Sequence, residues 1–427
     1  MNNDIERFYP TKGRVILHVD MNAFYCSVHA AHEPILYADK PTAVSGSVEK
    51  RKGIIITCSY EARSKKIKTG MTVKEALRYC PELILIPPDF SLYRTYSKRF
   101  IEIARQYTPI VEVVSIDECY MDITGSKLLG TPLDIAQSLQ KQIKEQLNIP
   151  CSIGIAPNKL LAKMASDMKK PNGLTVLRLR DVKDKLWHQP CQYLFGLGPK
   201  TAEKLKRINI HTIGQLAQSD VKVLTDLFGV YGNWLFRAAN GHDDSEVKAE
   251  VEQSKSIGHA TTLPADITEL DDINRILLSI ADQVGRRMRK QKLLAKTIQL
   301  TIRRPDMSTI QRSVTIQAPT HNMDIIAHEA KKLLLNNWNI GEPIRLLGIS
   351  ASNLVAEAEA VVPLDLFDYE EEPKKEALIK VMDELRDKYG ENTIVKAGML
   401  QSEIGARLRD KKRHGTSLEK LMDDNES

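Results

Sequence analysis

Two apolar runs that end abruptly in carboxylates constrain this chain more than any other feature. Val15 to Val19 is followed by Asp20, and Ile110 to Ile116 is followed by Asp117 and Glu118. Runs rich in β-branched residues predict buried strands. The three acids are therefore expected at buried strand ends, where a carboxylate is costly to desolvate unless a positive charge meets it.

Three carboxylates gathered in this way suit a hard divalent cation, and Mg²⁺ is the usual one where phosphates supply further ligands. Two such ions about 3.5–4 Å apart can activate one oxygen and stabilise another as it leaves. Asp20, Asp117 and Glu118 are accordingly the candidate metal ligands and catalytic residues. The alternative is a set of strand-end acids that cap neighbouring helices or pair with lysine.

The length and composition are those of an ordinary globular protein. With 427 residues the chain is long enough for two to four domains. No run approaches about 18 apolar residues, and the N-terminus contains no apolar signal core, so we expect a cytoplasmic protein without a membrane span. The six cysteines lie far apart without a C-x-x-C pair, which favours reduced structural thiols over a zinc site.

Positive charge is unevenly distributed along the chain. The net charge is +6, but the last 60 residues hold 12 Lys and Arg against 15 Asp and Glu. Between Arg275 and Arg312 there are ten basic residues and two acidic ones. A local excess of this size favours a polyanion partner over a merely solvated surface.

The pattern of apolar residues divides the chain into several parts. Residues 1–180 alternate between strand-like and helix-like segments, which predicts an α/β layer arrangement, with an insert at 23–85. Residues 181–243 are expected to be helical only, and the polar stretch 244–254 is expected to be a linker. Residues 255–360 predict the order β-α-β-β-α-β of a ferredoxin-like unit.

Two segments of these later parts suit nucleic acid. Leu194 to Leu205 has the form of a helix-hairpin-helix, in which glycines allow a tight turn and free N–H groups at the next helix can bind a phosphate; its candidate residues are Gly196, Gly198, Lys200 and Thr201. An ordinary turn between two helices is the alternative. In the ferredoxin-like unit, strand 297–303 should present a polar and cationic face to a phosphate backbone, formed by Thr297, Gln299, Thr301 and Arg303.

Five motifs together resemble the Y family of translesion DNA polymerases, in the branch that includes bacterial DNA polymerase IV. They are V-D-M-N-A-F-Y, S-Y-E-A-R, S-I-D-E-C-Y-M-D, G-I-A-P-N-K-L-L-A-K-M-A-S-D and K-K-P-N-G, in the family's order and spacing. The resemblance covers residues 13–367. It implies a right-hand polymerase fold with a ferredoxin-like palm (1–22 and 86–180), small fingers (23–85), a helical thumb (181–243), and a separate little finger (255–360).

The resemblance also assigns roles to single residues. Asp20, Asp117 and Glu118 would hold two Mg²⁺ ions, with the backbone carbonyl of Met21 as a further ligand. Asn22 departs from the family, because many members carry Asp at this position. Since that position is not a core metal ligand, the departure lowers the local charge without removing a ligand.

Other residues would contact the incoming nucleotide. By the resemblance, Tyr60, Arg63 and Lys170 contact the triphosphate, for which the planar fork of arginine is well suited. Tyr25 stands where the family keeps an aromatic steric gate, a ring that collides with a ribose 2′-hydroxyl. A core aromatic on the first helical turn is the alternative for Tyr25.

The implied reaction is template-directed addition of deoxynucleotides to a primer 3′-hydroxyl, with pyrophosphate leaving. Catalysis would be positioning plus charge neutralisation by the metals, and no further acidic cluster suggests a proofreading nuclease, so synthesis should be error-prone. The partners would be primer–template DNA and deoxynucleotides, and the chain is expected to act as a monomer. A nucleotidyl cyclase or a catalytically silent DNA-binding scaffold would each explain only part of the motifs.

A final segment suggests a protein partner. Pro363-Leu364-Asp365-Leu366-Phe367 follows the last expected strand and precedes an acidic run. Its large apolar side chains, Leu364, Leu366 and Phe367, suit docking into a pocket of a partner. The segment resembles the pentapeptide by which bacterial polymerases bind the sliding clamp, except that Pro363 replaces the usual Gln. Beyond it, Glu376 to Tyr389 predicts an amphipathic helix.

Overall fold

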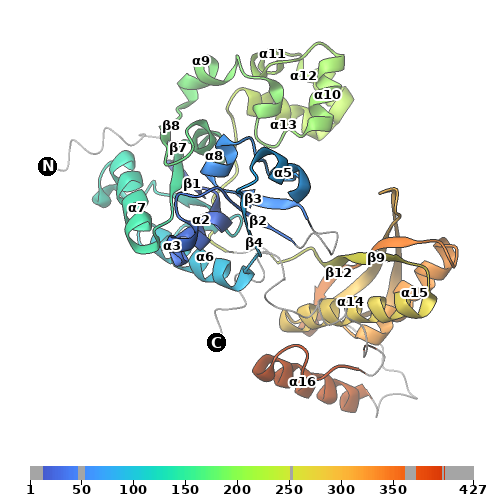
Figure 1. The fold of residues 1–427 in the computed structure, drawn as a ribbon. Helices are drawn as coiled ribbons and strands as arrows, with labels where there is room; N and C mark the ends of the chain where they lie inside the picture. Colours follow the sequence, from blue (N-terminus) through green and yellow to red (C-terminus); the bar gives the residue numbers. More distant parts are fainter. Residues whose placement is uncertain (1–12, 47–52, 251–252, 361–371, 397–398, 400–427) are drawn as a thin grey trace. The chain divides into compact units, whose positions relative to one another are not determined.

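The computed structural model describes residues 13–46, 53–250, 253–360, 372–396 and 399 (Figure 1). The chain divides at residues 251–252 into two compact units. The first unit contains both carboxylate motifs, and the second contains the expected β-α-β-β-α-β segment.

The first unit is built on a five-stranded sheet. Its strand order is β5-β6-β1-β7-β8, with β1 (Ile16–Met21), β5 (Val111–Val113), β6 (Glu118–Asp122), β7 (Cys151–Ala156) and β8 (Leu174–Val176). The pairs are antiparallel except β7–β8. Together with α6 (Phe90–Arg105) and α7 (Pro132–Leu147), strands β1, β5, β6 and β7 form two interlocked β-α-β units, as the α/β prediction requires.

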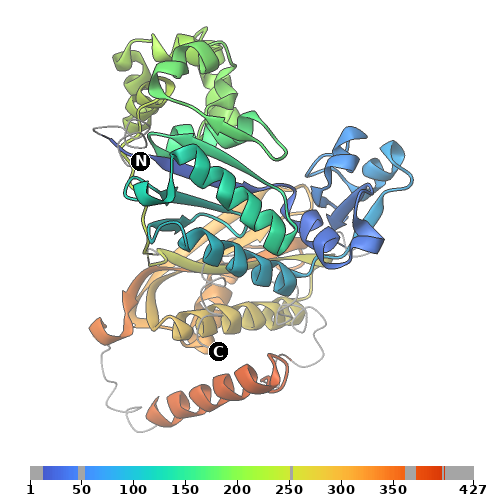
Figure 2. The same ribbon diagram turned by 90° about the vertical axis from the view of Figure 1, so that its left-hand side faces the viewer.

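The two faces of this sheet are covered by different helices. Side chains alternate along a strand, so Leu17, Val19 and Met21 of β1 join the core beneath α6 and α7, which lie side by side in Figures 1 and 2. His18 and Asp20 point to the opposite face, where α8 (Lys159–Met168) covers the sheet. The acid-bearing ends of β1 and β6 therefore face α8.

A glycine brings α8 unusually close to the sheet. A Cβ atom at Gly154 of β7 would lie 2.0 Å from the carbonyl oxygen of Ala162 in α8. Any larger residue at Gly154 would push the helix away. Gly154 therefore sets how far the side chains of α8 reach over the ends of β1 and β6.

The insert after β1 forms a small layer of its own. It contains a three-stranded sheet of order β3-β2-β4 and short helices: β2 (Thr42–Ser45), β3 (Ile55–Cys58), β4 (Ile84–Ile86), α3 (Pro34–Tyr37), α4 (Tyr60–Ser64) and α5 (Val73–Tyr79). Helix α2 (Phe24–His32) also follows β1, but Phe24 and Val28 pack into the core beneath α6 and α7. The small layer therefore begins only after α2.

Residues 179–241 are helical, apart from one isolated bridge between Pro190 and Thr212. The helices are η3 (Leu179–Asp181), α9 (Val182–Leu186), η4 (Cys191–Tyr193), α10 (Pro199–Arg207), α11 (Ile213–Ala217), α12 (Val221–Phe228) and α13 (Val230–Ala239). The hairpin predicted at 194–205 is present, but the helix before it is only the single 3₁₀ turn η4. This turn ends at Leu194, whose backbone is extended, and Gly196 follows with a positive φ.

The start of the expected linker is bound to the first unit rather than free. Asp243 Oδ2 accepts a hydrogen bond from Leu160 N at the start of α8 (3.1 Å). Glu112 on β5 accepts one from Lys248 N (2.9 Å), and Val247 is buried. Residues 243–248, here called the strap, therefore follow the surface of the sheet layer, which the polar sequence alone did not indicate.

The second unit confirms the expected order of elements. Its sheet has the order β11-β10-β12-β9 and is covered by two helices: β9 (Ser256–Ile267), α14 (Leu270–Lys290), β10 (Leu293–Arg303), β11 (Thr309–Thr320), α15 (Met323–Asn337) and β12 (Ile344–Ala356), followed by η5 (Glu357–Glu359). Ile298, Leu300 and Ile302 are buried beneath the helices, as their alternation predicts. The strands extend several residues beyond the expected bounds.

The amphipathic helix expected near the C-terminus is confirmed as α16 (Glu372–Tyr389). It is attached to α14 by ion pairs: Arg386 Nη1 lies 3.0 Å from Asp282 Oδ1, with both side chains almost fully buried. Arg286 and Arg289 of α14 pair in turn with Asp383. The basic run between Arg275 and Arg312 is therefore divided, and part of it serves to hold α16.

Two further expectations concern cysteines and membranes. The six cysteines are all free and buried, which confirms structural thiols. In the part of the chain that the structure describes, no helix is both long and apolar enough to span a membrane.

Candidate active site

The register between β1 and β6 brings two of the three carboxylates together. Asp20 is paired directly with Glu118 across the antiparallel ladder, and residues directly opposite share a face of the sheet. Asp20 is 6% exposed, and the side chain of Glu118 is 22% exposed. Two acids from segments about 100 residues apart therefore form one site on the face of the sheet that α8 covers.

Asp117 joins this site from the turn before β6. Its carbonyl oxygen accepts a hydrogen bond from Met21 N (3.0 Å), which ties the turn to the end of β1. Ser115 Oγ donates a hydrogen bond to Asp117 Oδ1 (2.6 Å) and fixes the carboxylate. Met21 itself is buried at the last position of β1. The four residues expected as metal ligands are thus neighbours at one strand end.

Two lysine ammonium groups neutralise these carboxylates. Lys163 Nζ of α8 lies 3.1 Å from Asp20 Oδ2 and 2.6 Å from Glu118 Oε1. Lys170 Nζ lies 2.8 Å from Asp20 Oδ2 and 2.7 Å from Asp167. No three His, Cys, Asp or Glu side chains in the described ranges form a ready metal cluster, and Asp20 and Glu118 are paired with ammonium groups instead.

The donor set nevertheless fits divalent cations. The oxygens of Asp20, Asp117 and Glu118 are hard ligands of the kind that Mg²⁺ prefers. The ammonium group of Lys163 contacts both Asp20 and Glu118, so this carboxylate pair already binds one positive group. The alternative considered from the sequence, in which the acids pair with lysine, is therefore present in the structure as well. Lysine pairing and metal binding would use the same oxygens of Asp20 and Glu118.

The environment shifts the pKa values of the three acids in different directions. Burial raises the pKa of Asp117 to about 6, and burial also raises the pKa of Asp20 against the opposing charges of Lys170 and Lys163. Burial acts in the same sense on Glu118, but the nearby His18 ring and the hydrogen-bonded ammonium group of Lys163 outweigh it and hold the pKa of Glu118 well below its usual range. Asp117 is therefore the acid with least compensation from positive groups.

Two residues of this site, Lys163 and His18, were not identified from the sequence. The side chain of His18 is fully buried beneath Glu118, with Nε2 3.7 Å from Oε2 and Nδ1 hydrogen-bonded to Ser166 Oγ (2.8 Å). Burial lowers the pKa of His18. Both residues interrupt an otherwise apolar buried pattern, and this interruption is the sequence signal that could have revealed them.

Asn22 organises the loop that carries Lys170. Asn22 Oδ1 accepts a hydrogen bond from Asn172 N (2.8 Å), and its Nδ2 donates one to Ser152 Oγ (3.1 Å). The residue is buried. The amide therefore holds the loop of the K-K-P-N-G motif against the end of β7, which explains why an uncharged side chain is accommodated here.

The nucleotide-binding candidates of the insert lie on α4. Ser59 caps this helix by accepting a hydrogen bond from Ala62 N, and it thereby places Tyr60 and Arg63 on the first turn. The Arg63 guanidinium lies 4.7 Å from the centre of the Tyr60 ring. The Tyr60 hydroxyl is buried and lacks a hydrogen-bond partner in the described part of the chain, and burial raises its pKa.

The start of α2 offers a further group of donors that the sequence did not reveal. Ala23 precedes the helix in a left-handed conformation (φ 47°), and no side chain caps the first turn. The backbone N–H groups there are of the kind that bind anions at helix N-termini. They adjoin Asp20 in the chain, so a phosphate held there would lie beside the carboxylates.

Tyr25 is packed on one side of its ring and accessible on the rest. Its ring stacks on Tyr93 (4.3 Å between centroids, 23° between planes) and meets the edge of Phe90 at 6.0 Å. The residue is only partly buried. One face is therefore fixed in the aromatic core, whereas the rest of the ring is accessible near the start of α2.

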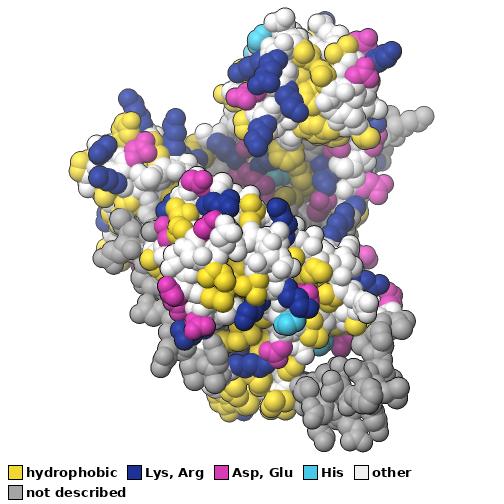
Figure 3. All heavy atoms as spheres, turned by 90° about the vertical axis from the view of Figure 1, so that its right-hand side faces the viewer, with side chains coloured by type: hydrophobic (Ala, Val, Ile, Leu, Met, Phe, Trp, Pro, Cys, Tyr) yellow, Lys and Arg dark blue, Asp and Glu magenta, His cyan; other side chains and the backbone are white. Residues whose placement is uncertain are grey.

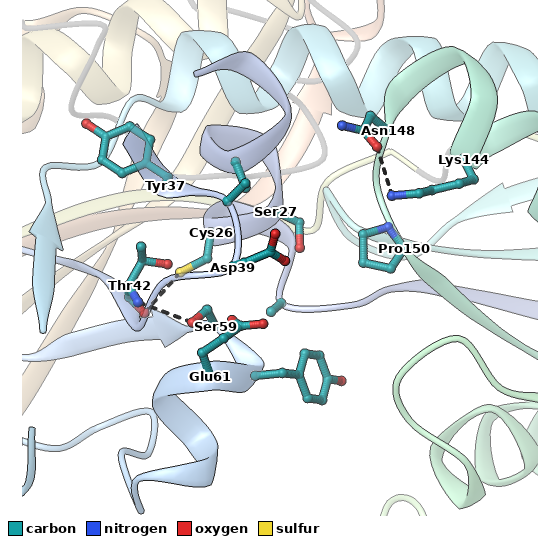
Figure 4. Close-up of a pocket in the computed structure, with 14 residues that line it drawn as sticks. Cys26, Ser27, Tyr37, Asp39, Thr42, Ser59, Glu61, Lys144, Asn148 and Pro150 are labelled. Atoms are coloured by element: carbon teal, nitrogen blue, oxygen red, sulfur yellow. Dashed lines mark hydrogen bonds between the residues drawn. The ribbon is translucent and has the colours of Figure 1, made fainter. Parts of the chain in front are cut away.

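A pocket of about 200 Å³ lies beside the site (Figure 4). Figure 4 shows Cys26, Asp39 and Glu61 around it, with Lys144 donating a hydrogen bond to Asn148 on its far side. The pocket shares Ala23 and Tyr60 with the site but contains none of the three carboxylates. Because those carboxylates lie outside its lining, the pocket is not itself the candidate reactive site.

The hairpin before α10 has the features of a phosphate site. Gly196 adopts φ 86°, and a Cβ atom there would lie 2.6 Å from the Trp234 ring. Tyr231 stacks on Trp234 and donates a hydrogen bond to Gly196 O (2.7 Å). Gly198 caps α10 without a side-chain hydrogen bond and with open space around it. The turn is thus held rigidly, and Gly196 and Gly198 are exposed.

Basic side chains accompany this hairpin. Lys200 is exposed and Thr201 is partly exposed on the first turn of α10. The last turn adds Lys204, Lys206 and Arg207. Figure 3 shows Lys and Arg side chains gathered on these helices at the top of the view.

The expected polar face of the second unit is only partly exposed. Arg303 is accessible and donates a hydrogen bond to Thr309 Oγ1 (2.9 Å), and Gln299 and Thr301 are also accessible. Thr297 was expected to be exposed, but it is buried by hydrogen bonds with Thr315 and Asn353. A short polar side chain between two long strands is covered by its neighbours.

The proposed docking peptide lies outside the described residues. This holds for Pro363, Leu364, Leu366 and Phe367 alike.

Comparisons with known proteins agree across most of the chain. The impB/mucB/samB family matches residues 19–167, and the C-terminal domain of the impB/mucB/samB family matches residues 254–366. DNA polymerase IV of Bacillus velezensis is 44% identical over 408 residues, which are 95% of this chain and 97% of that protein. DNA polymerase IV 1 of Bacillus subtilis is 44% identical over 412 residues, with 96% and 98% covered.

A further relative and a solved structure extend this similarity. DNA polymerase IV of Oceanobacillus iheyensis is 47% identical over 384 residues, which are 90% of this chain and 91% of that protein. The solved structure of a Y-family DNA polymerase chimera, Dbh-Dpo4(243-245)-Dbh, has a TM-score of 0.71 and 25% sequence identity. It covers 80% of this chain and 99% of its own.

The raised pKa of Asp117 predicts how the stability of the protein in EDTA depends on pH. Between the ordinary value of 3.8 and about 6, the folded protein binds more protons at Asp117 than the unfolded chain, so this contribution to stability falls as the pH rises. The full difference corresponds to at most roughly 3 kcal/mol. Thermal unfolding of the wild type and Asp117→Asn should show the variant gaining relative stability between about pH 4 and pH 7. A difference in melting temperature that stays constant over this range would contradict the assignment.

Proposed function

The chain belongs to the Y family of DNA polymerases and is a translesion DNA polymerase, and we propose that its nucleotidyl transfer takes place at the paired ends of β1 and β6 with two Mg²⁺ ions. The observation that carries this proposal is the register pair of Asp20 and Glu118, with Asp117 beside it on the turn. We further propose the palm, fingers, thumb and little finger as domains, within the ranges expected from the sequence and with α2 packed on the palm.

Within this proposal the carboxylates and the Met21 carbonyl hold the metals. Two bound Mg²⁺ ions would activate the primer 3′-hydroxyl and stabilise the pyrophosphate oxygen as it leaves. The protein itself supplies a rigid strand end, which fixes the oxygens before substrate arrives. The hydrogen bond from Ser115 and the pairing with Lys163 serve this positioning.

The triphosphate is proposed to bind between α2 and α4. The backbone N–H groups at the start of α2, the fork of Arg63 and the Tyr60 hydroxyl are donors on one side. Lys170 is a donor on the other, and its loop is fixed by Asn22. The Tyr60 hydroxyl supports this role, because a buried hydroxyl without a partner is rarely left so in a structure.

The DNA duplex is proposed to bind through phosphate contacts alone. The hairpin residues Gly196, Gly198, Lys200 and Thr201 offer backbone N–H groups and a positive charge. In the little finger, Arg303 with Gln299 and Thr301 forms the corresponding polar strand face. Contacts of this kind do not read sequence, which suits an enzyme that must follow any template.

The competing functions explain less of the structure. A nucleotidyl cyclase needs the carboxylates but not the rigid hairpin before α10. A catalytically silent scaffold needs the hairpin but not three acids held at one strand end. Neither accounts for relatives named DNA polymerase IV that match 90% or more of the chain.

Asp117→Ala tests the metal assignment. Because this variant removes one of three carboxylate ligands, we expect primer extension in Mg²⁺ to be abolished, while binding to primer–template DNA stays at the wild-type level. Gel-shift titration and a single-turnover extension assay measure the two quantities. Extension above a few per cent of wild type would exclude Asp117 as a required ligand.

Tyr25→Ala tests the sugar gate. If the accessible part of the ring excludes the 2′-hydroxyl, the variant should incorporate ribonucleotides while deoxynucleotide incorporation falls only modestly. Tyr107→Ala, which removes a partly buried tyrosine of the same core outside the site, is the matched control and should keep discrimination. Equal discrimination by Tyr25→Ala and wild type would assign the ring to the core only.

The peptide Pro363 to Phe367 is proposed to dock on a sliding clamp. Leu366→Ala with Phe367→Ala should remove stimulation by the clamp but leave extension without the clamp unchanged, because the apolar anchors of such a peptide dominate its affinity. The matched control is Leu378→Ala with Val381→Ala, two exposed apolar residues on α16. Persistent stimulation of the first variant would place the docking site elsewhere in the chain.

A further inference from the structure

Lys163 is a buried lysine that contacts two of the candidate metal ligands directly. It lies in the middle of α8 on the buried face of the helix, with its side chain 10% exposed. Its Nζ contacts Asp20 and Glu118 at 3.1 Å and 2.6 Å. A lysine is rarely buried unless it is paired, and here it is paired with two carboxylates at once.

Lys163 differs from the second lysine of the site in how it is held. Lys170 follows α8 in a loop, and its side chain is 25% exposed, so it can turn toward a bound phosphate. Lys163 is fixed by the helix, and the helix is fixed against the sheet at Gly154. Its ammonium group therefore stays between Asp20 and Glu118.

The neighbourhood of Glu118 supports a role in positioning. Glu118 lies between Lys163 on one side and His18 on the other. Ser166 Oγ bonds both to His18 Nδ1 and to the carbonyl oxygen of Lys163 (2.8 Å each). One turn of α8 thus holds the carboxylate pair from beneath.

We propose that Lys163 is a tethered counter-cation that keeps Asp20 and Glu118 in their paired geometry before metal binds and lowers the affinity of the site for divalent ions. This inference rests on the proposed metal site. Without this ammonium group, Lys170 would still pair with Asp20, but no ammonium group would bridge the two carboxylates, which would face each other at a paired register position; this is unfavourable. A divalent ion would relieve that repulsion, so its binding would become tighter.

The two effects of removing Lys163 therefore have opposite signs. The melting temperature in EDTA should fall, whereas the affinity for Mn²⁺ should rise at least tenfold. A tenfold change corresponds to about 1.4 kcal/mol, which is less than the attraction of two unit charges about 4 Å apart near a protein surface. A lysine with a purely structural role would lower stability without strengthening metal binding.

The test uses the full chain and Mn²⁺ alone, without nucleotide or DNA. Lys163→Met removes the charge and keeps the length of the side chain, and isothermal titration measures Mn²⁺ affinity beside thermal unfolding in EDTA. Lys159→Met is the matched control, because Lys159 lies one turn earlier on α8 and pairs with Glu112 at 2.7 Å outside the site. This control should lose stability with unchanged Mn²⁺ affinity.

The outcomes separate this inference from the proposed function. The proposed metal site is wrong if wild type binds no Mn²⁺, or if the Mn²⁺ that it binds is bound equally by Asp117→Ala. If that binding exists but Lys163→Met binds Mn²⁺ no more tightly than wild type, Lys163 is not a counter-cation. Should Lys163→Met fail to fold, Lys163→Gln, which can still donate hydrogen bonds, must show the same tighter binding.

Discussion

The antiparallel register of β1 and β6 is the constraint on which the site depends. It sets Asp20 opposite Glu118, and a shift of one residue would turn Asp20 into the core beneath α6 and α7. The cost of two acids at one buried position is offset by ammonium groups from α8 and from the loop after it. The surrounding layers can be understood as the means of holding this arrangement: α6 and α7 support one face of the sheet, and α8 supplies charge to the other.

The other functional residues are held by neighbours that have no chemical role of their own. Gly154 allows α8 to approach, Asn22 fixes the loop of Lys170, and Ser59 starts the helix that carries Tyr60 and Arg63. In the helical region the same principle applies to Gly196, whose left-handed turn is pressed against Trp234. Rigidity around the site is therefore distributed over small residues and caps rather than over large apolar ones.

Much of this could be predicted from the sequence, because the signals were local. The runs before Asp20 and Asp117 identified two strands of one sheet, and alternation in residues 297–303 correctly separated the buried isoleucines from the polar face. Motif resemblance supplied Tyr60, Arg63 and Lys170, which local patterns alone did not distinguish. The comparisons then established the family and the polymerase activity.

The features that were missed depend on contacts between distant segments. In the sequence Lys163 does not differ from an ordinary helical lysine, because its contacts with Asp20 and Glu118 form only when α8 packs on the sheet. Thr297 was expected at the surface because the alternation within its own strand does not reveal that Asn353 hydrogen-bonds to it and covers it. The basic run after Arg275 suggested one continuous face, but Arg286 and Arg289 are committed to α16, a helix about 100 residues later in the chain.

The strap at residues 243–248 bears on how the two proposed DNA-binding parts would cooperate. Two binding modules joined by a linker meet the same ligand at an effective concentration that falls as the free linker lengthens. Since Glu112 and the start of α8 hold residues 243–248, this first half of the linker does not add to that length. On the proposal that the hairpin before α10 and the little finger both bind one duplex, this fixed first half gives the little finger a higher effective concentration at that duplex than a free linker 244–254 would. The strap would then add avidity for DNA without making a contact to it.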